Sequence, residues 1–167
     1  FCNGLFISTI SMKIIRTDSA HVGFVSLVHQ LDSYLAVVDG ADHAFYDQYN
    51  GIDILHHVVV ITVEDKPVAC GAIKEYAAYV AEVKRMFTLP EKRGQGYARL
   101  VLSELEKWAQ ELGYTSCILE TGRRMSDAVS LYQKAGYDEI PNYGQYVGVD
   151  NSICFEKNIS LNITADN

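Results

Sequence analysis

A succession of strand, loop, helix and strand between residues 81 and 122 constrains the fold more than any other part of the sequence. The run "AEVKRMFTL" is strand-like and stops at Pro90, and "YTSCILETG" is short and apolar enough to be a buried strand. Between them, apolar residues recur at helical spacing from about Gly96 to Leu112. This order favours two parallel strands joined by a right-handed crossover. We therefore expect a sheet with a helix packed on it.

The N-terminal half adds elements of the same kinds. The run "MKIIRT" has the character of a short edge strand, and Asp18 or Ser19 can cap the helix that follows it. Gly40 ends that helix, and "ADHAFYDQYN" predicts a second, shorter one. The runs "HVVVITVE" and "VACGAIKEY" are separated by turn residues, so they predict a β-hairpin.

The C-terminal part completes the domain. The segment "SDAVSLYQKAGY" predicts a helix with Ser126 as its cap and Gly136 at its end, and "SICFEKNI" predicts a final strand. The full succession indicates one α/β domain with a mixed sheet. We place this domain at residues 12–158, with residues 1–11 as a non-native or flexible extension and residues 159–167 as a frayed tail.

Composition restricts the class of protein. A net charge of −7 argues against nucleic-acid binding, and no apolar run reaches the ~20 residues of a membrane span. Cys70, Cys117 and Cys154 lie in strand-like runs, and neither cysteines nor histidines have metal-ligand spacing. We therefore expect a cytoplasmic protein with reduced thiols and no metal, as a monomer or a simple homodimer, without a nucleic-acid or membrane partner.

The loop "RGQGYAR" raises the question of phosphate binding. Gly94 and Gly96 permit close approach to the unpaired amides at a helix start, which bind phosphate oxygens, although a plain strand-to-helix turn explains the same glycines. The Walker pattern fails because Tyr97 and Ala98 follow the last glycine, and the dinucleotide fingerprint fails because Arg99 replaces its third glycine. Basic residues cluster around this loop in an otherwise acidic chain: Lys92, Arg93, Arg99, Arg123, Arg124 and Lys134.

What remains is an R-x-x-G-x-A pattern formed by Arg93, Gly96 and Ala98 after a strand. It resembles the acetyl-CoA loop of the GNAT acetyltransferase superfamily, and "SLYQKAGY" resembles the second signature of that family. The resemblance covers roughly residues 57 to 158. It implies an acyl-CoA N-acyltransferase fold, in which a mixed, mostly antiparallel central sheet of six to seven strands is flanked by about four helices. It also implies acetyl-CoA as the co-substrate.

The same resemblance implies a set of cofactor-binding residues. Backbone groups near Phe87 would meet the oxyanion, and many relatives carry an asparagine for the pantetheine arm where this chain has Met125, a role that Ser126 could partly replace. The full set of cofactor-binding candidates is Met86, Phe87, Thr88, Arg93, Gly94, Gln95, Gly96, Tyr97, Ala98, Arg99, Ser126 and Lys134.

Acetyl transfer to an amine requires that the amine lose a proton and that the departing thiolate gain one, since the two groups titrate near ~10.4 and ~8.5. By resemblance Tyr132 is the candidate acid, although its helical spacing also fits a core tyrosine. Glu82 is the candidate base, with Glu120 and a chain of water molecules as alternatives.

The acceptor of the acetyl group is less defined by the sequence. The predicted N-terminal helices and the late "PNYGQY" loop carry acids and tyrosines that favour a cationic amine, and solvated surface acids explain them equally well. The leading hypothesis is transfer from acetyl-CoA to a primary amine of a small molecule, peptide or protein. The alternatives are a non-catalytic CoA-binding module and a transferase for another acyl group. The acceptor-side candidates are Asp32, Tyr34, Asp39, Asp42, Tyr46, Asp47, Tyr143 and Tyr146.

Overall fold

The computed structural model describes residues 10–160 as one α/β unit. Most of the elements match the predicted ones, and the short strand β6 was not predicted. The strands are β1 (Met12–Thr17), β2 (His57–Val63), β3 (Lys66–Ala77), β4 (Val80–Thr88), β5 (Ser116–Gly122), β6 (Asp138–Ile140) and β7 (Ser152–Asn158). The helices are α1 (Val22–Asp39), α2 (His43–Asp47), α3 (Tyr97–Glu111) and α4 (Ser126–Lys134), and the 3-10 turns are η1 (Gly40–Asp42), η2 (Pro90–Lys92) and η3 (Gly144–Tyr146).

The strands form one seven-stranded sheet in the order β1-β2-β3-β4-β5-β7-β6. Within the described residues, β4 and β5 are the only neighbours that run parallel, and α3 is the crossover between them. The expected mixed, mostly antiparallel sheet flanked by four helices is therefore confirmed. The predicted edge strand at residues 12–17 is also confirmed, because β1 pairs with β2 alone.

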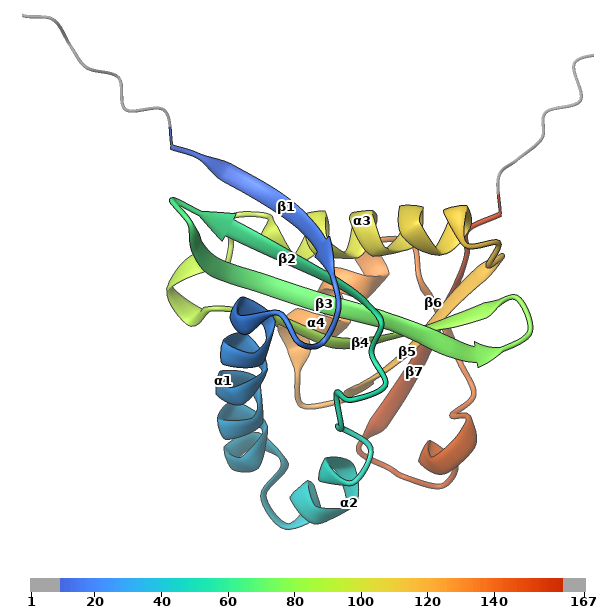
Figure 1. Ribbon diagram of the computed structural model, residues 1–167. Coiled ribbons are helices and arrows are strands. Elements are labelled where there is room, and N and C mark those ends of the chain that lie inside the picture. The colour runs from blue at the N-terminus through green and yellow to red at the C-terminus, as the bar shows by residue number, and fades with distance from the viewer. Residues whose placement is uncertain (1–9, 161–167) are drawn as a thin grey trace, which may run out of the picture.

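Helices cover both faces of the sheet (Figure 1). In that view α3 runs across the top and α4 lies behind the strands, while α1 lies to the lower left and α2 at the bottom. The α3 face holds the larger apolar core, which includes Val101, Leu105 and Phe155, and the α1 face holds a second core around Phe24 and Leu27. Burial of these side chains on two faces is what holds the three layers together.

The helix α3 lies unusually close to β3 at Gly71. A Cβ atom at this position would come within 2.4 Å of Met86 Sδ and 2.9 Å of Val101 Cγ1. Glycine is therefore required here by space, whereas no such restriction applies to the glycines of the predicted phosphate loop. The close contact fixes the height of α3, and hence of the loop that precedes it, above the sheet.

Two predicted helix caps are wrong. The helix α1 begins after His21, whose Nδ1 accepts the Gly23 amide at 3.2 Å, while Asp18 accepts the Ala20 amide one turn earlier. Ser126 is the first residue of α4 rather than its cap, and Met125 occupies the cap position without a side-chain hydrogen bond. In both places a hydroxyl or carboxyl suited to capping lies next to the helix start but out of register with it.

The packed unit reaches slightly beyond the predicted boundary at residue 158. Ile159 is buried, and its amide donates to the Thr115 carbonyl at 2.8 Å. Residues 1–9 of the predicted extension (1–11), with Cys2, and residues 161–167 of the predicted tail (159–167) lie outside the described residues. Cys70, Cys117 and Cys154 are free and buried, as expected. Across residues 10–160 no helix is long and apolar enough to cross a membrane.

Candidate active site

The two central parallel strands separate after a short stretch of pairing. Residues Val80 to Glu82 of β4 pair with β5, and the last pair joins Glu82 to Ile118. Beyond it, β4 keeps only β3 as a partner and β5 keeps only β7. Alternate backbone N–H and C=O groups of β4 residues 83–88 therefore face an open gap and can bind an extended ligand.

A bulge in β4 changes the direction in which side chains of this strand point beside the gap. The register with β3 shifts between the pairs Ala72↔Lys84 and Cys70↔Phe87, and Arg85 has a φ of 57°. A positive φ is unfavourable for a side chain as large as arginine, so surrounding contacts must hold it. The Arg85 guanidinium is buried and donates to Asp32 on α1, which supplies such a contact.

A cavity of about 120 Å³ occupies the gap between the separating strands. Its wall combines the first two helices, both strands, α4 and the loop before β7. The lining residues are Leu31, Leu35, Asp39, Tyr46, Asn50, Val83, Lys84, Arg85, Met86, Glu120, Thr121, Gly122, Met125, Ala128, Tyr132 and Tyr146.

Tyr132 presents a phenol to this cavity. Its ring packs against Tyr137 and Phe155, at centroid distances of 5.9 and 6.1 Å, so α4 and β7 fix its orientation. Its hydroxyl makes no hydrogen bond to any described residue. Burial, and then the charge of Glu120, raise the pKa of Tyr132, so the phenol stays protonated at neutral pH. Tyr132 is therefore a core tyrosine, as its helical spacing predicted, and it also lines the cavity. Its role as an acid stays a prediction.

Glu120 faces the same cavity from β5. Its Oε1 accepts a hydrogen bond from Ser152 Oγ at 2.6 Å, and Ser152 is within 3.0 Å of the Tyr46 hydroxyl. Burial raises the pKa of Glu120 to about 7, although the hydrogen bond from Ser152 and the charge of Lys84 favour the ionised form. A carboxyl with such a pKa can take up or release a proton near neutral pH.

Glu82, the other carboxyl candidate, does not line the cavity. It is 2% exposed, accepts a hydrogen bond from the Tyr143 hydroxyl at 3.0 Å, and lies 3.3 Å from Lys74 Nζ and 3.7 Å from Lys84 Nζ. These contacts occupy the carboxylate on several sides. The geometry favours Glu82 as the counter-ion of two lysines.

The predicted phosphate loop is exposed and open. Gly94 and Gly96 have φ values of 72° and 87°, and no atom lies within 4 Å of a Cβ built on either. Gly96 occupies the cap position of α3 in the left-handed conformation, without a side-chain cap, so the first α3 amides point outward. Arg93 and Arg99 are exposed beside them. Amide donors, the positive helix end and open space fit the pyrophosphate of coenzyme A.

The remaining cofactor candidates lie on β4, on the loop and first residues of α3, and on α4. Arg93 Nε donates to the Thr88 carbonyl at 3.3 Å, and its guanidinium lies 5.2 Å from the Tyr34 ring centroid, which ties the loop to β4 and α1. Met86 lines the cavity, and Phe87 and Thr88 continue β4 toward the loop. The α4 candidates Ser126 and Lys134 are exposed at the first and last positions of that helix, and Gln95, Tyr97 and Ala98 lie on the loop or the α3 start.

Replacing Gly96 with glutamate tests the loop directly. We expect the Kd for coenzyme A to rise at least about 10-fold, because a carboxylate would stand where the helix amides meet phosphate. Titration calorimetry measures this constant. The matched control is Gly113→Glu at the far end of α3, where φ is 91° and space is equally open. Equal affinity of the Gly96 and Gly113 variants would contradict a phosphate role for the loop.

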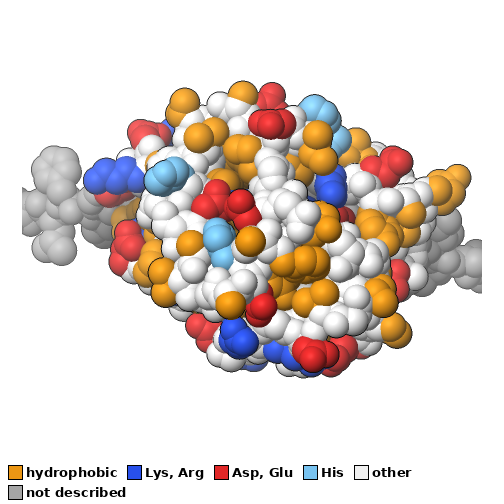
Figure 2. All heavy atoms as spheres, turned by 90° about the horizontal axis from the view of Figure 1, so that it is seen from below, with side chains coloured by type: hydrophobic (Ala, Val, Ile, Leu, Met, Phe, Trp, Pro, Cys, Tyr) orange, Lys and Arg blue, Asp and Glu red, His pale blue; other side chains and the backbone are white. Residues whose placement is uncertain are grey.

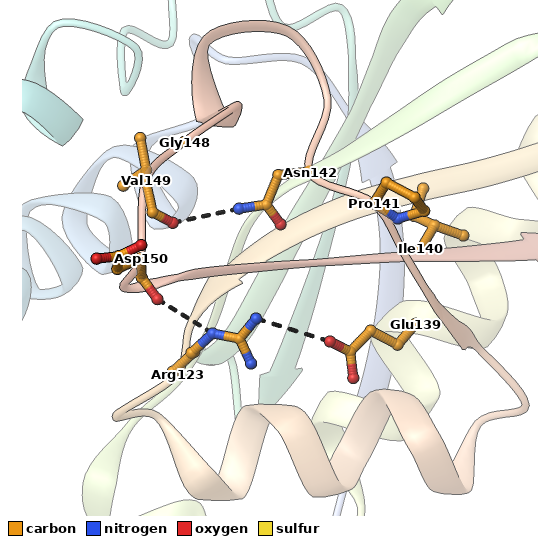
Figure 3. A pocket seen from close by; sticks show the side chains of 8 residues that line it. All are labelled: Arg123, Glu139, Ile140, Pro141, Asn142, Gly148, Val149 and Asp150. Atoms are coloured by element: carbon orange, nitrogen blue, oxygen red, sulfur yellow. Dashed lines mark hydrogen bonds and ion pairs between the residues drawn. The ribbon is translucent and has the colours of Figure 1, made fainter.

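The loop before β7 carries Tyr146 into the cavity, and Asn142 holds that loop in shape. Its Nδ2 donates to the carbonyls of Tyr146, Val149 and Ser152 at 3.1, 3.2 and 3.2 Å. Figure 3 shows Asn142 directed at Val149 across a separate, open hollow of about 580 Å³. Sequence reasoning missed Asn142 because its partners are carbonyls, which leave no signal in residue type.

Removing these donors is expected to loosen the wall of the cavity. We predict that Asn142→Ala lowers the free energy of unfolding by about 1–3 kcal/mol, because partly buried carbonyls lose their donor. Urea denaturation monitored by circular dichroism measures the change. Asn142→Asp keeps the shape without the donors and should lose a similar amount. An unchanged unfolding midpoint in both variants would show that the loop is held by other contacts.

The structure separates the acceptor-side candidates that the sequence left equivalent. Asp39, Tyr46 and Tyr146 line the cavity. Asp42 and Asp47 are exposed, and Asp32 is the partner of Arg85. Among lining residues the sequence did not single out are Leu31, Leu35, Asn50, Lys84 and Arg85. They come from elements far apart in the chain, and only the folded sheet brings them together.

A family model and several known proteins match most of this chain. The model of the acetyltransferase (GNAT) family matches residues 24–137, which is more than half of the chain. The IAA acetyltransferase of Azospirillum brasilense is 27% identical over 161 residues, covering 88% of this chain and 97% of its own. The uncharacterized N-acetyltransferase YjgM of Escherichia coli is 30% identical over 132 residues, covering 77% of this chain and 74% of its own.

Solved structures share the fold. One of them is a Klebsiella pneumoniae protein described as an acyl-CoA N-acyltransferase. It superposes with a TM-score of 0.71 at 24% identity, over 89% of this chain and 97% of its own. The PaiA N-acetyltransferase of Thermoplasma acidophilum, in complex with coenzyme A, superposes with a TM-score of 0.63 at 18% identity, over 89% and 99%. Together with the family match, these observations show that the chain is an acyltransferase that belongs to the GNAT family.

Proposed function

We propose that this protein transfers an acetyl group from acetyl-CoA to a primary amine by direct attack within a ternary complex. The observation that carries the proposal is the meeting of Tyr132 and Glu120 in one cavity, at the point where β4 and β5 separate. One group is a protonated phenol and the other a carboxyl with a pKa near neutrality. Transfer to an amine needs one proton donor and one proton acceptor.

Glu120 is the proposed proton acceptor. Attack forms a bond from the amine nitrogen to the acetyl carbon, and the proton that the nitrogen loses passes to the Glu120 carboxylate. Ser152 holds one carboxylate oxygen, so the other is free to face the amine. Glu82 is the less suitable base, since Lys74, Lys84 and Tyr143 already surround it. We propose that Glu82 instead fixes the charge of Lys84 beside the cavity.

Tyr132 is the proposed proton donor. When the carbon–sulfur bond breaks, the phenol supplies the proton that converts the leaving thiolate to a thiol. Glu120 and Tyr132 face one cavity, so the proton that enters on Glu120 can leave the site and Tyr132 can regain its own from solvent through the same opening. The free hydroxyl of Tyr132 makes it available for this contact.

The backbone of β4 and the α3 loop would hold the co-substrate. We propose that unpaired β4 groups of Met86, Phe87 and Thr88 bind the pantetheine arm and that one of their amides meets the developing oxyanion. Residues 93–99 would bind the pyrophosphate. The α4 residues Ser126 and Lys134 would contribute from the opposite side of the cleft.

Thiol release from acetyl-CoA against a panel of amines and peptides tests the proposal, with mass spectrometry to identify the acetylated product. We expect thiol release that depends on the acceptor and matches product formation. Binding of coenzyme A without turnover on any acceptor would favour a non-catalytic CoA-binding module. Faster turnover with a longer acyl-CoA would identify a transferase for another acyl group.

A further inference from the structure

Asp39 lies at the end of α1 in an environment that does not satisfy its charge. The residue is 6% exposed, yet its carboxylate accepts no hydrogen bond from any described residue. The nearest basic nitrogen is His43 Nδ1 at 3.9 Å, which is at the limit of an ion pair and too far for a hydrogen bond. The charges of His43 and Arg124 only partly offset the effect of burial, which raises the pKa of Asp39. A largely buried carboxylate without a donor from the protein is costly, so a ligand that supplies one would be bound favourably.

The cations around the cavity already have partners. Arg85 pairs with Asp32, and Lys84 lies 3.7 Å from Glu82 Oε1 and donates to the Tyr146 hydroxyl at 3.2 Å. Asp39 and Glu120 line the same cavity without a lysine or arginine within ion-pair distance of either. Figure 2, seen from below, shows exposed acidic side chains beside a histidine, to the left of the centre of this face.

The two carboxyls also influence one another. Burial raises the pKa of Asp39, and the charge of Asp39 is among the causes that raise the pKa of Glu120. The charge of Asp39 therefore disfavours the ionised form of Glu120, and a cation bound between the two carboxyls would favour the ionised form of both. The Tyr46 ring lines the same wall and adds a surface that attracts cations.

We propose that the acceptor is a linear dication, in which one amine is acetylated at Glu120 while the second ammonium binds Asp39. This inference rests on the proposed function, and it makes Asp39 a specificity-determining residue. The small cavity volume, about 120 Å³, favours an unbranched aliphatic chain between the two nitrogens. A diamine would place a nitrogen at each carboxylate, whereas a simple alkylamine would leave Asp39 buried and unpaired.

The experiment compares linear diamines of increasing length with monoamines of the same length, for example putrescine with butylamine. We expect kcat/KM for the best diamine to exceed that of its monoamine by about 10- to 100-fold, as for one partly buried charge pair. A diamine has two amines that can react, so the measured ratio of kcat/KM values should exceed the statistical factor that the second amine alone contributes. Asp39→Asn should remove most of the preference, chiefly through a higher KM for the diamine. Asp47→Asn, an exposed carboxyl on α2, is the matched control and should keep the preference.

Three results would overturn the inference while the proposed function stands. The first is acetylation of monoamines and diamines with equal kcat/KM. The second is a diamine preference that survives Asp39→Asn. The third is a preference for γ-aminobutyrate over putrescine and butylamine, which would show that Lys84 or Arg85 recognises a carboxylate instead. If no amine of any kind is acetylated, the proposed function itself fails, and this inference fails with it.

Discussion

Replacing Tyr132 with phenylalanine is expected to lower kcat by about 10²- to 10⁴-fold, the usual contribution of a positioned general acid. The change removes only the hydroxyl, which makes no hydrogen bond to described residues, while the ring keeps its contacts with Tyr137 and Phe155. Stability and coenzyme A affinity should therefore stay close to wild type. Steady-state thiol release, with calorimetric titration of coenzyme A, measures both quantities.

Tyr137→Phe is the control for the loss of a phenol next to this position. Tyr137 is buried against Tyr132, but it does not line the cavity. Its removal should therefore leave kcat nearly unchanged. A Tyr132→Phe enzyme with wild-type kcat would remove Tyr132 from the mechanism and return it to the role of an ordinary core residue.

The second large effect is expected at Glu120. Glu120→Gln should lower kcat by about 10²- to 10⁴-fold near pH 8, because the amide cannot accept the proton of the amine. The substitution keeps an oxygen for the Ser152 hydroxyl, so the fold around it is preserved.

The pH dependence of kcat provides a second test of Glu120 as the base. The carboxylate is the active form and its pKa is about 7, so wild-type kcat should fall as pH decreases through that value. The Gln variant should lose this limb and keep only the dependence set by the acceptor amine. Glu82→Gln should lower the melting temperature, because two lysines lose their counter-ion, but should retain the limb near pH 7. Loss of the limb in the Glu82 variant alone would assign the base to Glu82.

The sequence was sufficient to predict the loop between β4 and α3 and the burial of Tyr132. Gly94 and Gly96 follow a strand and precede an amphipathic helix, and both have the positive φ that favours glycine. Helical spacing placed Tyr132 on the buried side of α4, where the structure has it. Local periodicity and backbone conformation decide these positions, so residue order alone can predict them.

The choice between the two carboxyls could not be made in this way. Glu82 and Glu120 both lie on the central parallel strands, and the register places Glu82 opposite Ile118, two residues before Glu120. One pairs with lysines from β3 and β4, and the other faces the gap that opens beyond that register. Strand separation is a tertiary property, with no pattern in either strand that would signal it.

The acidic N-terminal helices show the same limit. Asp39, Asp42 and Asp47 have equivalent surroundings in the sequence, yet only Asp39 is buried. Its burial follows from the turn at η1 and from the contact of α2 with the β7 region through Tyr46 and Ser152. Likewise β6 is too short for periodicity to detect, and it forms because β7 offers it an edge.

The most direct test of the account is formation of the N-acetylated amine, measured by mass spectrometry, by wild type and by the Tyr132→Phe, Glu120→Gln double variant. We predict that both proteins bind coenzyme A with similar affinity. Wild type should form product in step with thiol release, and the double variant should be at least about 10²-fold slower. Product formation by the double variant at the wild-type rate would contradict the assignment of this cavity as the active site.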